Sequence, residues 1–179
     1  NMIGDYTLTV NGVLTVNGTA MDPVVFTGQN ATAKVRGGWD RILLVGAGSS
    51  INHAVVEYAD VGIEARAAVT LNNVTVRLTR WDGIELENAD NSVLTNVTAT
   101  QAGQSGLYVH TNSTGVTVTN LTTTQNAANG IWVDGGSTLT VDASLLAGNA
   151  HRGVGTDSAT LNISNSTVEL NTLCGLCYY

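Results

Sequence analysis

Two sets of side chains recur at nearly regular intervals, and their types suit the chemistry of sugars. The first set holds Glu85, Tyr108 and Trp132, and the second holds Glu87, His110, Asp134 and Asp157. Aromatic faces stack on sugar rings, and two carboxylates about 5 to 9 Å apart can catalyse cleavage of a glycosidic bond. The first set is therefore a candidate carbohydrate-binding site, and the second set holds the alternative catalytic residues.

Eight Asn-x-Ser/Thr sequons offer a second kind of chemistry, which is N-glycosylation. Four of them coincide with a recurring asparagine position to which we assign a structural role below. The other four are the glycosylation candidates Asn17, Asn30, Asn112 and Asn162. Asn112 is the best placed of these, because it follows the stretch around Tyr108 in an expected turn.

Metal and cofactor chemistry finds little support in the sequence. Cys174 and Cys177 are the only cysteines, so they supply at most half of a four-thiolate zinc site. They could instead form a disulfide with each other or with a neighbouring chain. Five aspartates in expected turns could contact calcium singly: Asp22, Asp40, Asp60, Asp82 and Asp90. No aspartate-repeat loop is present, and we expect neither a metal site nor a cofactor.

A repeat of about 22 residues, a period typical of solenoid proteins, positions these side chains. Its clearest mark is a glycine followed by a branched aliphatic residue, which recurs at nearly constant spacing along the chain. The glycines are Gly62, Gly83, Gly106, Gly130, Gly153 and Gly175, and Arg41-Ile42 extends the phase to a seventh copy. Short stretches of alternating apolar and polar residues lie between them, which indicates strands with one buried face. Repeats of this length with two or three short strands predict one coil each of a parallel β-solenoid.

Stacked coils convert each recurring position into a ladder. One inner ladder is expected to hold Ile63, Ile84, Leu107, Ile131, Val154 and Leu176. A second inner ladder is expected to hold Val74, Val97 and Leu121, and to weaken at Ala143 and Ser166. The structural asparagine ladder is expected at a corner, with each amide bonding the next and satisfying buried turn groups. Its members are Asn52, Asn73, Asn96, Asn120 and Asn165.

The glycine column, the asparagine ladder and the coil length together resemble right-handed parallel β-helix proteins of the pectin-lyase-like superfamily. The stretch 13–27, followed by Gly38-Trp-Asp-Arg-Ile42, looks like secreted and surface β-helix proteins of bacteria and archaea. The resemblance implies an all-β fold, a single right-handed parallel β-helix (β-solenoid) of about eight coils, each of about 21–24 residues. We divide this domain, 1–179, into N-terminal coils over 1–38, regular coils over 39–173 and an incomplete terminal coil over 174–179.

Charge and composition exclude several functional classes. The formal net charge is −7, with 14 acidic and 7 basic residues, which argues against binding to nucleic acid. No apolar run approaches the roughly 20 residues of a membrane span. The catalytic clusters typical of the resembled hydrolases and lyases are also missing, which favours a non-catalytic role. Ice binding is a remote third hypothesis, since outward threonines occur in pairs in two successive coils, at Thr98/Thr100 and Thr122/Thr124.

These observations favour an extracellular or cell-surface structural protein, such as a scaffold, an adhesin or a fibre subunit. The sequence begins and ends in strand patterns without an evident cap, so we expect self-association end to end, with a glycan or another surface component as a further partner. The alternative function is binding or degradation of a polysaccharide by the acidic and aromatic strip.

Overall fold

The computed structural model describes residues 6–28 and 34–179, whose regular elements are all β-strands. The first sheet runs in the order β1 (Leu8–Val10), β4 (Ile42–Leu44), β6 (Ile63–Ala65), β8 (Ile84–Glu87), β10 (Leu107–His110), β13 (Ile131–Asp134), β16 (Arg152–Asp157) and β19 (Cys174–Tyr178). The second sheet contains β2 (Thr15–Asn17), β3 (Val24–Phe26), β5 (Ser49–Glu57), β7 (Val69–Arg77), β9 (Val93–Thr100), β11 (Val116–Thr119), β12 (Thr122–Thr124), β14 (Thr138–Asp142), β15 (Leu145–Ala147), β17 (Thr160–Ser164) and β18 (Thr167–Glu169).

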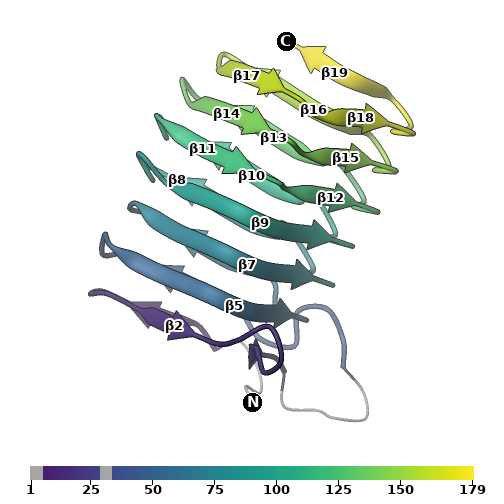
Figure 1. The fold of residues 1–179 in the computed structure, drawn as a ribbon. Coiled ribbons are helices and arrows are strands. Elements are labelled where there is room, and N and C mark those ends of the chain that lie inside the picture. Colours follow the sequence, from purple (N-terminus) through teal and green to yellow (C-terminus); the bar gives the residue numbers. More distant parts are fainter. Residues whose placement is uncertain (1–5, 29–33) are drawn as a thin grey trace.

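Successive coils stack in parallel along one axis (Figure 1). The predicted fold, an all-β right-handed parallel β-helix, is confirmed. The described residues complete about six turns, against the eight coils expected. Within the described ranges, no helix is long and apolar enough to cross a membrane.

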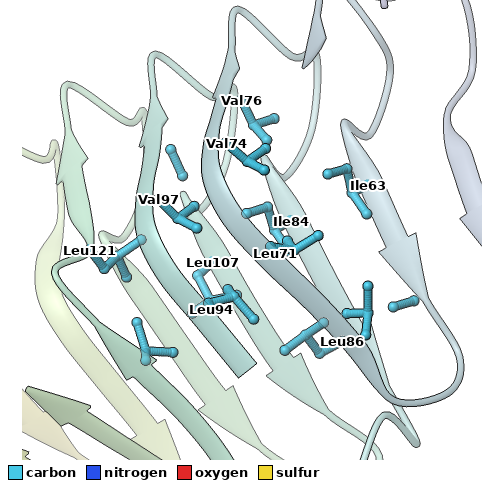
Figure 2. Packing of buried hydrophobic residues seen from close by; sticks show 14 of the residues in the cluster. Ile63, Leu71, Val74, Val76, Ile84, Leu86, Leu94, Val97, Leu107 and Leu121 are labelled. Carbon is cyan, nitrogen blue, oxygen red and sulfur yellow. The ribbon is translucent and has the colours of Figure 1, made fainter. Parts of the chain in front are cut away.

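The first inner ladder lies where the repeat predicts it. Leu107 is paired in register with Ile84 on one side and with Ile131 on the other, and all three are fully buried. The ladder continues through Val154 to Leu176, which is 46% exposed. Figure 2 shows Ile84 and Leu107 packed inside the coils with the second ladder beside them.

The second inner ladder departs from the prediction in its later coils. Val74, Val97 and Leu121 are buried as expected (Figure 2). The next member is Ser144 and not Ala143, because the backbone of Ala143 turns the corner with a positive φ. The buried Ser144 hydroxyl accepts a hydrogen bond from the backbone N–H of Leu121 at 3.0 Å. The ladder is therefore polar at Ser144, and the serine hydroxyl satisfies the hydrogen-bonding capacity of a backbone N–H group.

The column of glycines is explained by the close approach of neighbouring coils. A Cβ atom on Gly83 would lie 2.6 Å from the carbonyl oxygen of Gly106, and one on Gly106 would lie 2.9 Å from that of Gly130. Contacts this short require the absence of a side chain. The glycines thus let the coils stack at the turn that leads into the first sheet.

The predicted asparagine ladder forms on the surface and lacks one predicted member. Asn73, Asn96 and Asn120 occupy corners with positive φ, and the amide of Asn96 donates to Asn73 at 3.2 Å while that of Asn120 donates to Asn96 at 2.7 Å. The placement of Asn52 in this ladder is wrong, because this coil is one residue shorter and His53 takes the corner. Asn52 instead pairs with Asn72 between strands β5 and β7.

Two further features of this ladder correct the expectation. Asn165 donates to the carboxylate of Asp142 at 2.7 Å, since Ala143 holds the corner before it. Asn96 and Asn120 are exposed, so they do not satisfy buried groups as expected. A buried asparagine stack exists at another corner, where Asn149 accepts hydrogen bonds from the backbone N–H and the amide of Asn126.

Candidate functional site

The two recurring sets of side chains form two rows on the outer face of the first sheet. Glu85, Tyr108 and Trp132 are paired in register across β8, β10 and β13. In the second row, Glu87 is paired with His110, and Asp134 is paired with Asp157. Both rows therefore have the register that the repeat predicts.

A groove of about 280 Å³ lies at the start of these strands. Its lining comes from the turns before β8, β10 and β13, from the first residue of β16 and from the first row. The lining residues are Asp82, Gln104, Ser105, Tyr108, Ala128, Asn129, Trp132 and Arg152. Four of them precede a column glycine directly, namely Asp82, Ser105, Asn129 and Arg152. The groove thus spans four successive coils along the helix axis.

One carboxylate fixes the aromatic side chains of the groove. Asp134 Oδ2 accepts a hydrogen bond from the Tyr108 hydroxyl at 2.9 Å and another from the Trp132 indole N–H at 3.0 Å. The Tyr108 ring also stacks on the His110 ring, with 4.2 Å between their centroids. Burial, followed by the hydrogen bond to Asp134, raises the pKa of Tyr108, so this hydroxyl stays protonated. Two aromatic side chains are thereby held in fixed orientations.

An arginine closes one end of the groove. The Arg152 guanidinium lies over the rings of Trp132 and Tyr179, at 5.5 and 4.9 Å from their centroids. It also donates a hydrogen bond to the Tyr179 hydroxyl. The Trp132 ring covers Gly155, where a Cβ atom would lie 2.4 Å from the ring. Glycine at this position therefore leaves room for the indole.

A pair of carboxyl groups lies at the other end. Asp82 is buried and accepts a hydrogen bond from the Ser105 backbone N–H at 2.8 Å, and its charge raises the pKa of the neighbouring Glu85. Burial raises the pKa of Asp82 and raises that of Glu85 to about 7. The negative charges of Asp82 and Glu64 add to the effect on Glu85, and Arg41 opposes it. The pair therefore retains a proton near neutral pH.

The raised pKa of Glu85 predicts that the substitution Glu85→Gln stabilises the protein at pH 8. Between pH 4.5 and about 7, the folded state holds a proton that the unfolded state has lost, so stability falls as the pH rises. The amide of Gln can still donate to Asp82 but never ionises. We expect a gain of about 1 to 3 kcal/mol at pH 8 and a smaller one at pH 5.

Urea unfolding at both pH values measures this difference. Glu169→Gln, at an exposed position of β18, serves as the control. A Glu85→Gln variant with the same pH dependence as the wild type would show that Glu85 ionises normally.

The alternative catalytic residues do not gather around the groove. Glu87 forms an ion pair with Arg66 at 3.1 Å, and the Nδ1 atom of His110 contacts the Thr111 hydroxyl at 2.8 Å. Asp157 is exposed. Asp134 contacts the groove only through the two aromatic side chains that it orients.

The glycosylation candidates and the two cysteines lie outside the lining of the groove, whereas the calcium candidate Asp82 is part of it. Asn17, Asn112 and Asn162 are exposed, and Asn30 lies outside the described residues. Cys174 and Cys177 form a disulfide within β19. In the described part of the chain, no three His, Cys, Asp or Glu side chains are grouped as metal ligands would be.

Several residues of the groove are not among the candidates from the sequence. Ser105, Asn129, Arg152 and Tyr179 belong to no predicted site, and Asp82 is a candidate only for calcium. The signal for four of the groove residues is their shared position directly before a column glycine, which is a turn position that faces outward. Tyr179 carries no such signal, since it contacts the site only through Arg152 and Trp132.

Comparisons with known proteins agree with this architecture. The family model described as the right-handed beta helix region matches residues 59–179. Two solved structures are similar. The periplasmic alginate epimerase AlgG has a TM-score of 0.59 at 12% identity, covering 80% of this chain and 42% of that one. Pectate lyase Pel9A has a TM-score of 0.61 at 13% identity, covering 95% and 56%. The chain thus spans about half the length of these proteins. No curated protein matches the sequence.

Proposed function

Because the chain belongs to the right-handed β-helix family, we propose that its rigid coils present the groove beside Tyr108 and Trp132 as a binding site for a saccharide chain. Stacked coils suit this role, since they hold successive side chains at fixed intervals of about 4.8 Å along an extended ligand. A binding role explains why the groove contains aromatic side chains and hydrogen-bonding groups. It also explains why the four alternative catalytic residues are not clustered there.

The observation that carries the proposal is the double hydrogen bond to Asp134. A single carboxylate oxygen accepts from both Tyr108 and Trp132, so both rings are held before a ligand arrives. Preorganised aromatic surfaces lose little conformational entropy on binding. The polar lining of Ser105 and Asn129 then supplies the directional contacts that a hydroxyl-rich ligand requires.

The other hypothesis from the sequence is a purely structural role as a scaffold, an adhesin or a fibre subunit. A purely structural face does not need a hollow lined by oriented aromatic rings and a raised-pKa carboxyl pair. We therefore favour saccharide binding. An adhesin that binds through this groove would combine the two roles.

We also propose that the protein works outside the cytoplasm. The Cys174–Cys177 disulfide supports this location, since disulfides persist in oxidising compartments. One of the structurally similar proteins is named as periplasmic, and both are named for activities on polysaccharides, alginate and pectate.

The proposal predicts that Trp132→Ala weakens saccharide binding at least tenfold, which is about 1.4 kcal/mol. The indole supplies a large apolar surface for stacking, and alanine removes it. Affinity is measured by calorimetry against hexasaccharides of neutral, uronic-acid and amino sugars. The matched control is Trp81→Ala, because Trp81 also lies beneath an arginine, at 5.4 Å from Arg80, but does not line the groove.

Thermal unfolding of both variants shows whether the fold is intact. Equal affinities for wild type and Trp132→Ala, or failure of every hexasaccharide to bind, would contradict saccharide binding at this groove.

A further inference from the structure

The distribution of ion pairs identifies an unpaired cation in the groove. Five of the seven basic residues form ion pairs with carboxylates, namely Lys34, Arg41, Arg66, Arg77 and Arg80. Arg36 donates to the carbonyl oxygen of Thr79. Among the described residues, Arg152 has no carboxylate partner, although the protein is acidic overall. An unpaired guanidinium in a groove is suited to an anionic group of a ligand.

The surroundings of Arg152 support this assignment. Its Nε atom is shielded from solvent and has no hydrogen-bond partner in the described structure. Its other nitrogens contact the Tyr179 hydroxyl and, at 3.4 Å, the Asn129 side-chain oxygen. Neither partner carries a charge, so the positive charge of Arg152 is not neutralised by these contacts.

The opposite end of the groove carries unpaired negative charge. Asp82 and Glu85 lie at the same end, and neither forms an ion pair among the described residues. Asp82 is held by the Ser105 backbone and lines the groove. A carboxyl pair without a cation is suited to an ammonium group, which can donate up to three hydrogen bonds.

The two charged ends lie on one line along the axis. Asp82, Ser105, Asn129 and Arg152 precede the column glycines of four successive coils. Three coil spacings separate Asp82 from Arg152, or about 14 Å at about 4.8 Å per coil. The uncharged Ser105 and Asn129 lie between them, so the groove has a negative end, a neutral middle and a positive end.

We propose that this groove binds a dipolar saccharide segment, with a free amino group at Asp82 and Glu85 and an acidic group at Arg152. The inference rests on the proposed saccharide binding and specifies its ligand class. A uniformly acidic chain would bring anions against Asp82, and a uniformly basic chain would bring cations against Arg152. Each mismatch costs affinity, so the charge pattern selects a chain that carries both groups.

The test compares four hexasaccharides by calorimetry at low salt. The dipolar probe alternates glucuronate and glucosamine, and its acetylated form differs only by the loss of the free amines. The other two probes are a glucosamine hexamer and an N-acetylglucosamine hexamer. We expect the dipolar probe to bind about tenfold more tightly than its acetylated form or the glucosamine hexamer.

Two charge-neutralising variants assign each preference to one end. The double variant Asp82→Asn/Glu85→Gln, which removes both carboxyl groups, should abolish the preference for the free amine, and Arg152→Gln should abolish the preference for the dipolar probe over the glucosamine hexamer. Arg36→Gln is the matched control, since it removes the other arginine without an ion pair, away from the groove. This variant should keep both preferences.

The outcomes separate this inference from the proposed function. Binding that depends on Trp132 but is equal for the dipolar and acetylated probes would overturn the dipolar ligand and retain a saccharide site. Preferences that survive in Asp82→Asn/Glu85→Gln and in Arg152→Gln would overturn the assignment of the two ends. Failure of all four probes to bind would also overturn the inference, whereas the proposed function is tested by the panel of neutral, uronic-acid and amino-sugar hexasaccharides.

Discussion

Leu107→Ala is expected to lower the free energy of unfolding by about 2 to 5 kcal/mol. Leu107 is fully buried between Ile84 and Ile131, which are fixed by the backbone pairing of their own coils. The coils can close only slightly around the cavity, because their spacing is set by parallel hydrogen bonds throughout the sheet. Most of the lost packing is therefore not recovered.

Urea unfolding followed by circular dichroism measures this loss. Leu173→Ala is the matched control, because Leu173 is 60% exposed and its truncation should change stability by less than about 0.5 kcal/mol. A loss for Leu107→Ala as small as that of the control would mean that the ladder is loosely packed.

Asn149→Ala is expected to cost about 2 to 4 kcal/mol, because it leaves buried polar groups without partners. Asn149 accepts hydrogen bonds from the backbone N–H and the amide of Asn126 and donates one to the carbonyl oxygen of Thr123. It also donates to the side chain of Asn171 at 3.0 Å. Alanine can replace none of these bonds, and Asn149 is shielded from water.

Asn120→Ala provides the comparison for this variant. Asn120 also belongs to an amide ladder, but it is exposed and water can replace its hydrogen bond to Asn96. We expect a loss below about 1 kcal/mol. Equal losses for the two variants would show that burial does not distinguish the two asparagine ladders.

The comparison between the two asparagine ladders also shows what the sequence can predict. The exposed ladder is visible as an asparagine ten residues before a column glycine. The buried ladder has an equally regular signal, with Asn126, Asn149 and Asn171 each four residues before Gly130, Gly153 and Gly175. The periodicity alone does not reveal which ladder is buried, because burial depends on how sharply each corner turns.

The core and the outer rows are predictable for a different reason. Parallel coils repeat the same inward and outward positions, so the phase of one glycine column fixes the neighbours of Ile84 and of Tyr108. The phase fails where a coil changes length between the column and the corner. One such coil displaces Asn52 from its expected corner, whereas Ser144 keeps the phase, since it lies nine residues before Gly153 just as Leu121 lies nine before Gly130.

The groove is predictable only in part. Tyr108 and Trp132 follow the repeat, but the contacts that orient them depend on side-chain directions across coils. The sequence suggests Asp134 as a catalytic residue, whereas in the structure its carboxylate holds both rings. The role that we propose for Arg152 depends on its having no carboxylate partner among the described residues, which only the positions of the other charges show.

The most direct test of saccharide binding at this groove is a titration followed through the indole N–H signals of the three tryptophans in a ¹⁵N-labelled sample. Trp132 donates to Asp134 in the groove, Trp39 is buried and donates to the carbonyl oxygen of Glu57, and Trp81 is 45% exposed outside the groove. When the tightest-binding hexasaccharide is added, we expect the Trp132 signal to shift and saturate while the Trp39 and Trp81 signals stay in place. A shift of the Trp81 signal with an unchanged Trp132 signal would contradict the proposed site.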